Sequence, residues 1–248
     1  MIAQNDKSSR NGSIKPVEDN QLPFDSEAEL VKHIEIEFFE QWKKPNSSFI
    51  REFDSSNGIA DIVVFQLKQN HKKHLNIGKI PPRWLYALRH MPYQKLFTID
   101  ALAIELGVSK ERASVAIKKY AELGFCVEGS KKHTWKKVKQ PQLLTTTIYA
   151  VEAKLRKWNH ALTQAIRYLD YANQSWVVLD SSCANAAIKN IEKFQKFNIG
   201  LATIGTSGEF KVQHKPISKK PKSEYRLWYA NAEIARIVSL SNECDNSS

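Results

Sequence analysis

The stretch IYAVEAKL, residues 148–155, is the part of the chain from which the fold can be worked out. Its apolar residues are typical of a buried β-strand, yet the stretch ends with Glu152 and Lys154, which are two residues apart. Side chains at positions i and i+2 of a strand lie on the same face. The sequence therefore predicts a core strand that carries a carboxylate and an ammonium group side by side at its end.

Secondary-structure patterns after this strand alternate between helix and strand. A helix is predicted over 157–174, a strand over 175–180, a helix over 184–197, a strand over 199–204, a hairpin turn over 206–208 and a helix over 223–240. The alternation predicts an α/β fold in which one sheet has helices packed against it.

The N-terminal part contributes to the same layers. Residues 1–22 are polar, and we expect them to be disordered. A helix is predicted over 24–42, beginning near Glu27, because Ser26 and Glu29 form a capping box. Strands are predicted over 49–53 and 59–65, and Asn57 and Gly58 form the turn of a hairpin between them.

The segment between these two parts has a different character. Three short helices are predicted over 81–91, 98–108 and 109–124, followed by two short strands over 125–129 and 133–139. We therefore divide the chain into a tail (1–22), a discontinuous α/β domain (23–78 and 142–248) and an inserted domain (79–141), called the insertion below.

Charge and composition narrow the class of partner. The chain has 248 residues and a formal net charge of +11, which favours a polyanion such as nucleic acid. A ribosome-associated or membrane-surface protein would have a similar charge. The three cysteines form no CxxC pair, so we expect neither a zinc site nor disulfides, and a reducing cytoplasm. No apolar run approaches the ~20 residues of a membrane-spanning helix, and we expect no signal peptide and no membrane partner.

Ionisable residues at strand ends indicate a chemistry. Asp61 lies at the start of the strand 59–65, and Glu152 and Lys154 lie at the end of the strand that opened this section. An aspartate and a glutamate on neighbouring strands can share a hard cation such as Mg²⁺. A lysine beside them can orient a water molecule or stabilise charge that develops on a phosphate. The simpler alternative is a solvated salt bridge at a strand end, with Asp61 capping a turn.

Together these residues resemble the PD-(D/E)XK nuclease superfamily, over about 26–68 and 145–215. The resemblance rests on GIAD with Asp61, on EAK with Glu152 and Lys154, and on a helix-borne glutamate, Glu27 or its rival Glu29. Gln164 and Tyr168 are similar to the QxxxY element of RecB-like members, although an ordinary exposed helical pair would have the same spacing. Ala60 stands where the motif has proline.

The resemblance implies a restriction-endonuclease-like mixed sheet flanked by helices. It implies Mg²⁺ or Mn²⁺ between Asp61 and Glu152, with Glu27 as an outer or second-metal ligand. Lys154 would place the attacking water, Gln164 would orient Lys154 or a phosphate, and hydrolysis would leave a 5′-phosphate.

The insertion resembles winged-helix domains. Between Lys79 and Lys139 it has 13 Lys and Arg against 5 Asp and Glu, a difference of 8. The residues predicted to contact nucleic acid lie on its third helix and on its wing: Lys110, Arg112, Ser114, Lys118, Lys131, Lys132, Lys136 and Lys137. A winged helix used for protein contacts is the alternative.

The sequence thus predicts a metal-dependent endonuclease that acts on double-stranded DNA. Two alternatives stay open, namely a non-catalytic DNA-binding or assembly subunit of a larger defence or mobile-element complex, and an RNA nuclease. The oligomeric state is also open between a homodimer and membership of a larger complex.

Overall fold

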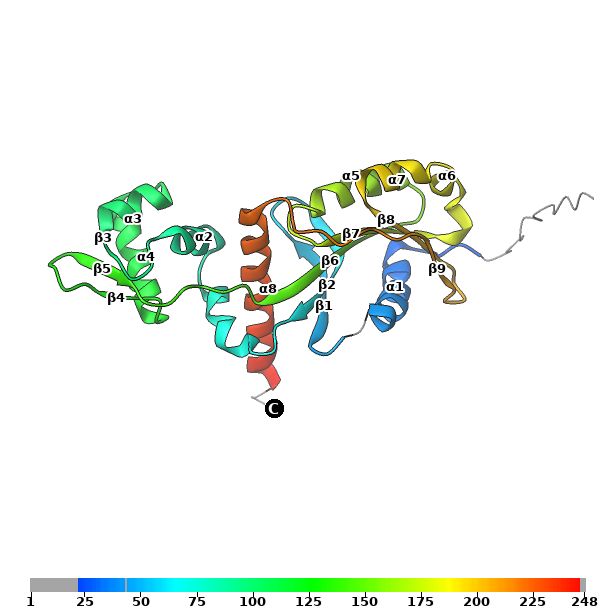
Figure 1. The fold of residues 1–248 in the computed structure, drawn as a ribbon. Coiled ribbons are helices and arrows are strands. Elements are labelled where there is room, and N and C mark those ends of the chain that lie inside the picture. Colours follow the sequence, from blue (N-terminus) through cyan, green and yellow to red (C-terminus); the bar gives the residue numbers. More distant parts are fainter. Residues whose placement is uncertain (1–21, 43, 246–248) are drawn as a thin grey trace, which may run out of the picture.

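The computed structural model describes residues 22–42 and 44–245, so the predicted disordered tail lies outside the described residues except for Leu22. A six-stranded mixed sheet forms the centre, in the order β1-β2-β6-β7-β8-β9 (Figure 1). Its strands are β1 (Ser47–Asp54), β2 (Ile59–Leu67), β6 (Thr145–Lys154), β7 (Gln174–Asp180), β8 (Gly200–Ile204) and β9 (Phe210–His214). The predicted α/β class and mixed sheet are therefore confirmed.

Pairing within the sheet follows from the connections. The hairpin turn at Gly58, where φ is +120°, makes β1 and β2 antiparallel, and β2 pairs antiparallel with β6. Helical crossovers make β6, β7 and β8 parallel, and β9 returns antiparallel to β8. Such central strands are buried on both faces, which explains the nearly continuous apolar run of β6.

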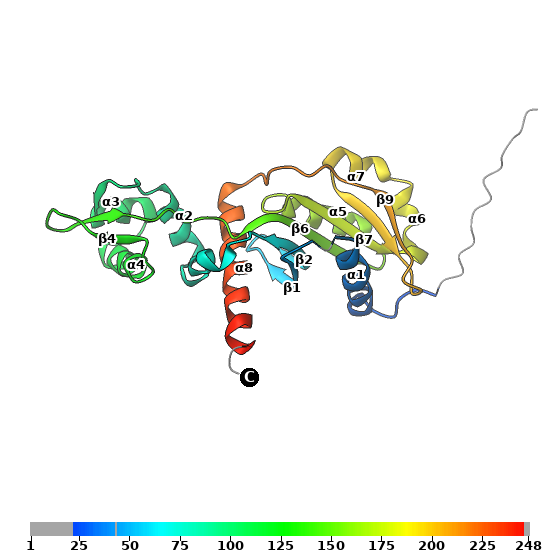
Figure 2. The ribbon, with the colours of Figure 1, turned by 60° about the horizontal axis from the view of Figure 1, so that its bottom comes forward.

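Helices cover both faces of this sheet. The helix α1 (Glu27–Trp42) buries Leu30 and Ile34 against one face, where they meet Val151 and Ala153 of β6. The opposite face carries α5 (Trp158–Tyr168), α6 (Asn185–Ile188), α7 (Ile191–Phe197) and the long α8 (Glu224–Asp245), as Figures 1 and 2 show. Consecutive residues of β6 therefore point into two different apolar clusters.

Two predicted helices are shorter than expected. The helix predicted over 157–174 ends at Tyr168, and Asn173 instead accepts a hydrogen bond from the backbone of Ile148 and donates one to Lys219. The helix predicted over 184–197 is broken near Asn190, whose side chain bonds the carbonyl oxygen of Ala186. Asn190 satisfies a backbone group locally, which competes with helix continuation, whereas Asn173 binds backbone groups from distant parts of the chain.

The insertion contains a second, three-stranded sheet in the order β3-β5-β4. Its elements are α2 (Pro82–His90), β3 (Leu96–Thr98), α3 (Ile99–Leu106), α4 (Lys110–Glu122), β4 (Cys126–Glu128) and β5 (Thr134–Lys137), preceded by the 3₁₀ helix η1 (His71–Lys79). Thr98 and Ser109 cap α3 and α4, and Gly107 adopts the left-handed conformation between them. The three predicted helices and the two predicted strands are confirmed, and β3 was missed.

A shared apolar cluster joins the insertion to the central sheet. It contains Leu85 and Leu88 of α2, Trp228 of α8 and Val63 of β2, among others. Arg89 adds polar contacts, because its side chain pairs with Glu224 at 3.0 Å and lies over the ring of Trp228. The insertion is therefore packed on the rest of the protein, and removing it would expose apolar side chains of α8.

None of the helices in the described residues is long and apolar enough to cross a membrane.

Candidate active site

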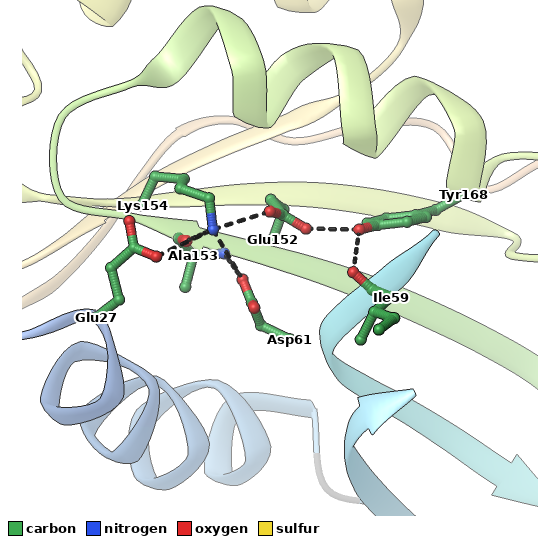
Figure 3. Close-up of polar contacts among 7 residues, drawn as sticks. All are labelled: Glu27, Ile59, Asp61, Glu152, Ala153, Lys154 and Tyr168. Atoms are coloured by element: carbon green, nitrogen blue, oxygen red, sulfur yellow. Dashed lines mark hydrogen bonds and ion pairs between the residues drawn. The ribbon is translucent and has the colours of Figure 1, made fainter. Parts of the chain in front are cut away.

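Four oxygen atoms surround the ammonium group of Lys154 at the end of β6 (Figure 3). The Lys154 Nζ atom lies 3.0 Å from Glu152 Oε1, 3.2 Å from Glu27 Oε2 and 3.7 Å from Asp61 Oδ2. It also donates a hydrogen bond to the carbonyl oxygen of Ala153 at 2.9 Å. The structure thus brings together Glu27, Asp61 and Glu152, called the carboxylate cluster below, around one cation.

Strand register places the carboxylates of Asp61 and Glu152 beside each other. Ile62 pairs with Val151 across the β2–β6 ladder, so one further step along the strands sets Asp61 opposite Glu152. Directly opposite side chains share a face and have Cβ atoms about 4.5–5.5 Å apart. The backbone N–H of Ala153 donates to Asp61 Oδ2 at 2.7 Å, which fixes that carboxylate. Like charges in such a pair repel, and Lys154 supplies the countercharge.

Helix α1 brings the third carboxylate. Half of its predicted capping box is present: Ser26 Oγ accepts from the N–H of Glu29 at 3.1 Å, but Glu29 Oε2 accepts from the N–H of Asp25 at 3.0 Å instead of that of Ser26. Glu29 is therefore occupied at the cap, whereas Glu27 reaches Lys154. The geometry favours Glu27 over Glu29 as the helix-borne member of the site.

Burial of the cluster changes its electrostatics. Glu152 is only 1% exposed and Lys154 15% exposed, so the solvated salt bridge that was the simpler alternative is wrong. Burial, together with the charge of Asp61, raises the pKa of Glu152, and burial also raises the pKa of Asp61. Burial alone would lower the pKa of Lys154, but the attraction of Asp61, Glu152 and Glu27 outweighs it and raises that pKa.

Tyr168 of α5 contacts Glu152, whereas the expected contact of Gln164 with Lys154 is absent from the described structure. The Tyr168 hydroxyl lies 2.6 Å from both Glu152 Oε2 and the carbonyl oxygen of Ile59. Tyr168 is fully buried, so the reading of an exposed helical pair is wrong for it. The buried Gln164 Oε1 has no hydrogen-bond partner among the described residues, so the predicted contact with Lys154 is absent there. Tyr168 thus binds Glu152 Oε2, while Lys154 binds Glu152 Oε1.

The donor set of the cluster suits a hard divalent cation. Carboxylate and carbonyl oxygens are the ligands that Mg²⁺ and Mn²⁺ prefer, and here they already surround a cation, the Lys154 ammonium. Within the described part of the chain, however, no three acidic, histidine or cysteine side chains are positioned to hold a metal ion directly. The donor chemistry therefore suits a hard cation, but in the described structure the Lys154 ammonium group occupies the centre of the carboxylate cluster.

The insertion residues predicted to contact nucleic acid have varied surroundings. Lys110 pairs with Asp100 at 2.6 Å, and the Ser114 hydroxyl donates to the carbonyl oxygen of Lys110. Lys136 is half-buried. The exposed members are Lys110, Arg112, Lys118, Lys131 and Lys132. Their contact with nucleic acid stays a prediction.

Lys137 does not lie where a phosphate contact requires. It is 1% exposed, and its Nζ atom donates to the carbonyl oxygens of Leu88 and Arg89 at 3.0 and 3.1 Å. Burial lowers the pKa of Lys137 from 10.5 to about 8. The predicted wing contact is wrong for this residue, because its side chain turns inward and binds the C-terminal end of α2, where the helix dipole favours a cation.

We expect Lys137→Ala to destabilise the protein. The change leaves a cavity and removes the Lys137 hydrogen bond to the carbonyl oxygen of Leu88, whereas that of Arg89 keeps a bond from Gln140, so unfolding should become easier by about 2–4 kcal/mol. Between pH 8 and 10.5 the unfolded chain binds the Lys137 proton more tightly than the folded chain, so wild-type stability rises there and the difference from the variant widens. Denaturant unfolding at several pH values measures both effects. The exposed control Lys132→Ala should unfold like the wild type, and equal stability of the two variants would contradict the prediction.

Comparisons with family models, with curated proteins and with solved structures found no match to this chain.

The sequence did not predict one of the groups that bind Lys154. The carbonyl oxygen of Ala153 belongs to the backbone, and its role depends on how Lys154 folds back over its own strand. The alternation of the strand predicts only that Glu152 and Lys154 share a face.

Proposed function

We propose that this protein is a metal-dependent endonuclease that hydrolyses phosphodiester bonds in DNA, with a restriction-endonuclease-like fold of the PD-(D/E)XK type. The observation that carries the proposal is the convergence of Glu27, Asp61, Glu152 and the Ala153 carbonyl on one cation position. The raised pKa values of Asp61 and Glu152 support the proposal, because perturbed pKa values are frequent at functional sites.

Each residue then has a definite task. Asp61 and Glu152 would hold Mg²⁺ or Mn²⁺, with Glu27 as an outer ligand, and a bound metal would polarise the phosphate and lower the pKa of a bound water. Lys154, displaced from the centre but tethered to the same strand face, would orient the attacking water and stabilise charge on the phosphate. Tyr168 would keep Glu152 in place through its 2.6 Å hydrogen bond.

We further propose that the insertion is a winged helix that binds DNA. The support is its element order, with α3 and α4 joined at Gly107 and followed by the β4–β5 hairpin, and its excess of basic residues. Lys131 and Lys132 lie in the loop between β4 and β5 and are exposed.

Replacing Lys131 and Lys132 with glutamine should weaken DNA binding and flatten its dependence on salt. Each lost phosphate contact lowers the slope of log K against log salt concentration by about 0.9. Fluorescence anisotropy across a salt series measures this slope. An unchanged slope would mean that the insertion serves protein contacts instead.

The direct test of the endonuclease proposal is incubation with supercoiled plasmid and Mg²⁺ or Mn²⁺. Nicked or linear product is expected with either metal and not with a chelator. A parallel reaction with structured RNA separates a DNA nuclease from an RNA nuclease. Cleavage that persists in the chelator would contradict a metal-dependent mechanism.

One observation favours a second candidate function, that of a non-catalytic DNA-binding or assembly subunit. The Lys154 ammonium already fills the position that a metal would take, so the cluster is partly neutralised without one. Calorimetry with Mn²⁺ separates the two functions, because a scaffold would bind no metal at Asp61 and Glu152.

A further inference from the structure

A cavity of about 560 Å³ opens directly beside the carboxylate cluster. Glu27 and Lys154 belong to its lining, so the cavity and the cluster are continuous. Its lining also includes Arg156 and Lys157, which connect β6 to α5, and His160 in the first turn of α5. This volume lies in the range of ordinary ligand sites.

Three basic side chains of the cavity, unlike Lys154, have no partner among the described residues. Arg156, Lys157 and His160 are exposed, and their side chains form no hydrogen bond or ion pair with any residue that the structure describes. Unpaired cations beside a deep opening are free to bind an anion.

The acidic residues of the same lining are mostly occupied. Glu27 pairs with Lys154, and the buried Asp180 accepts hydrogen bonds from the backbone of Phe24 and from Ser182. Asp25 is the remaining acid of the lining, and its carboxylate does not pair with Arg156 or Lys157. The groups available to a ligand are therefore positive on balance.

The start of α5 adds to this preference. The helix begins at Trp158, and the residue before it, Lys157, provides no side-chain cap for the first N–H groups. An uncapped helix N-terminus carries partial positive charge and attracts phosphate. In this cavity the N-terminus of α5 adds its partial positive charge to the side chains of Arg156, Lys157 and His160.

The insertion contributes no residue to the lining of this cavity. Figures 1 and 2 both show α8 between the insertion and the elements α1 and α5 that border the cluster. DNA bound on the insertion therefore needs a second, local anchor to present one phosphate to Asp61 and Glu152.

We propose that Arg156, Lys157 and His160 form a phosphate-binding subsite for the DNA strand that is cleaved, holding the phosphates next to the scissile one. The proposal rests on the proposed function and adds the residues that position its substrate. Arg156 and Lys157 bind neighbouring phosphate oxygens, and His160 donates a hydrogen bond from one turn further along α5.

The test compares Arg156→Gln/Lys157→Gln with the wild type for binding of a fluorescent DNA duplex in Ca²⁺ across a salt series. The slope of log K against log salt concentration should fall by about 1.8, the value for two lost phosphate contacts. Cleavage should show a raised KM. Heat of Ca²⁺ binding without DNA should stay that of the wild type, because neither residue contacts the carboxylate cluster.

The matched control is Lys189→Gln/Lys196→Gln, which removes two exposed cations of the neighbouring helices that do not line the cavity. It should keep the wild-type slope. A slope equal to wild type in the Arg156/Lys157 variant, or an equal loss in the control, would overturn the proposal. If the Arg156/Lys157 variant has the reduced salt slope but the wild-type protein does not cleave DNA, the phosphate subsite stands and only the proposed hydrolysis is overturned.

Cys183 gives a readout that needs no catalysis. It lines the same cavity and is partly exposed, whereas Cys126 is buried and burial raises its pKa to about 12. In a Cys244→Ser background, DNA should slow the alkylation of Cys183 by iodoacetamide, and Arg156→Gln/Lys157→Gln should remove this protection. Equal alkylation rates with and without DNA in the parent protein would contradict strand binding in the cavity.

Discussion

Asp61→Asn is expected to reduce DNA cleavage about a thousandfold, which corresponds to about 4 kcal/mol of lost transition-state stabilisation. An amide oxygen is a poorer ligand for a hard divalent ion than a carboxylate. The heat of Mn²⁺ binding in calorimetry should therefore fall together with the cleavage rate. Plasmid nicking at saturating metal concentration measures the rate.

The fold should survive this change. Asparagine has the shape of aspartate, and its amide oxygen can still accept the hydrogen bond that Ala153 N donates to Asp61 Oδ2. The control Asp54→Asn alters an exposed aspartate of β1 whose Oδ1 likewise accepts from a backbone N–H, that of Ser56. The control should cleave DNA and bind Mn²⁺ like the wild type. Wild-type cleavage by Asp61→Asn would show that the carboxylate cluster is not catalytic.

Lys154→Met should have opposite effects on cleavage and on metal binding. Cleavage should fall about 10²- to 10³-fold, because a positioned charge at the phosphate is lost. Metal affinity should rise about tenfold or more, equivalent to at least ~1.4 kcal/mol, because a metal no longer competes with an ammonium held by four oxygens. Calorimetry with Ca²⁺ measures the affinity without turnover.

The metal-free Lys154→Met protein should also be less stable. Lys154 neutralises the buried Glu152, so its loss should cost about 1–3 kcal/mol rather than the smaller amount typical of an exposed pair. Added Ca²⁺ should restore the melting temperature. The control Lys154→Arg keeps the positive charge and should bind Ca²⁺ no more tightly than the wild type. Equal Ca²⁺ affinity of Lys154→Met and wild type would mean that the ammonium does not occupy the metal position.

Much of this architecture follows from local sequence patterns. The turn at Gly58 and the apolar runs around it predict the β1–β2 hairpin, and Ser26 with Glu29 predicts where α1 begins. The spacing of Glu152 and Lys154 predicts that both lie on one face of β6. These signals depend on residues that are close together in the chain.

Features that depend on distant parts of the chain could not be predicted in the same way. The wing pattern suggested an exposed Lys137, but the carbonyl groups it binds belong to α2, which precedes it by nearly the whole insertion. The spacing of Gln164 and Tyr168 could not show which of them reaches Glu152, because that depends on where α5 packs on the sheet. Likewise, free cations such as Arg156 differ from ordinary surface cations only through the cavity they border.

The position of the insertion also affects the order in which the protein folds. β2 and β6 are neighbours in the sheet, yet the whole insertion separates them in the chain, so their pairing must close a long loop. Loop closure costs entropy that grows with the length of the flexible segment, and an insertion that has already folded shortens that segment. During synthesis the β1–β2 hairpin that carries Asp61 would therefore form first, and β6 with Glu152 would pair with it only after the insertion had folded.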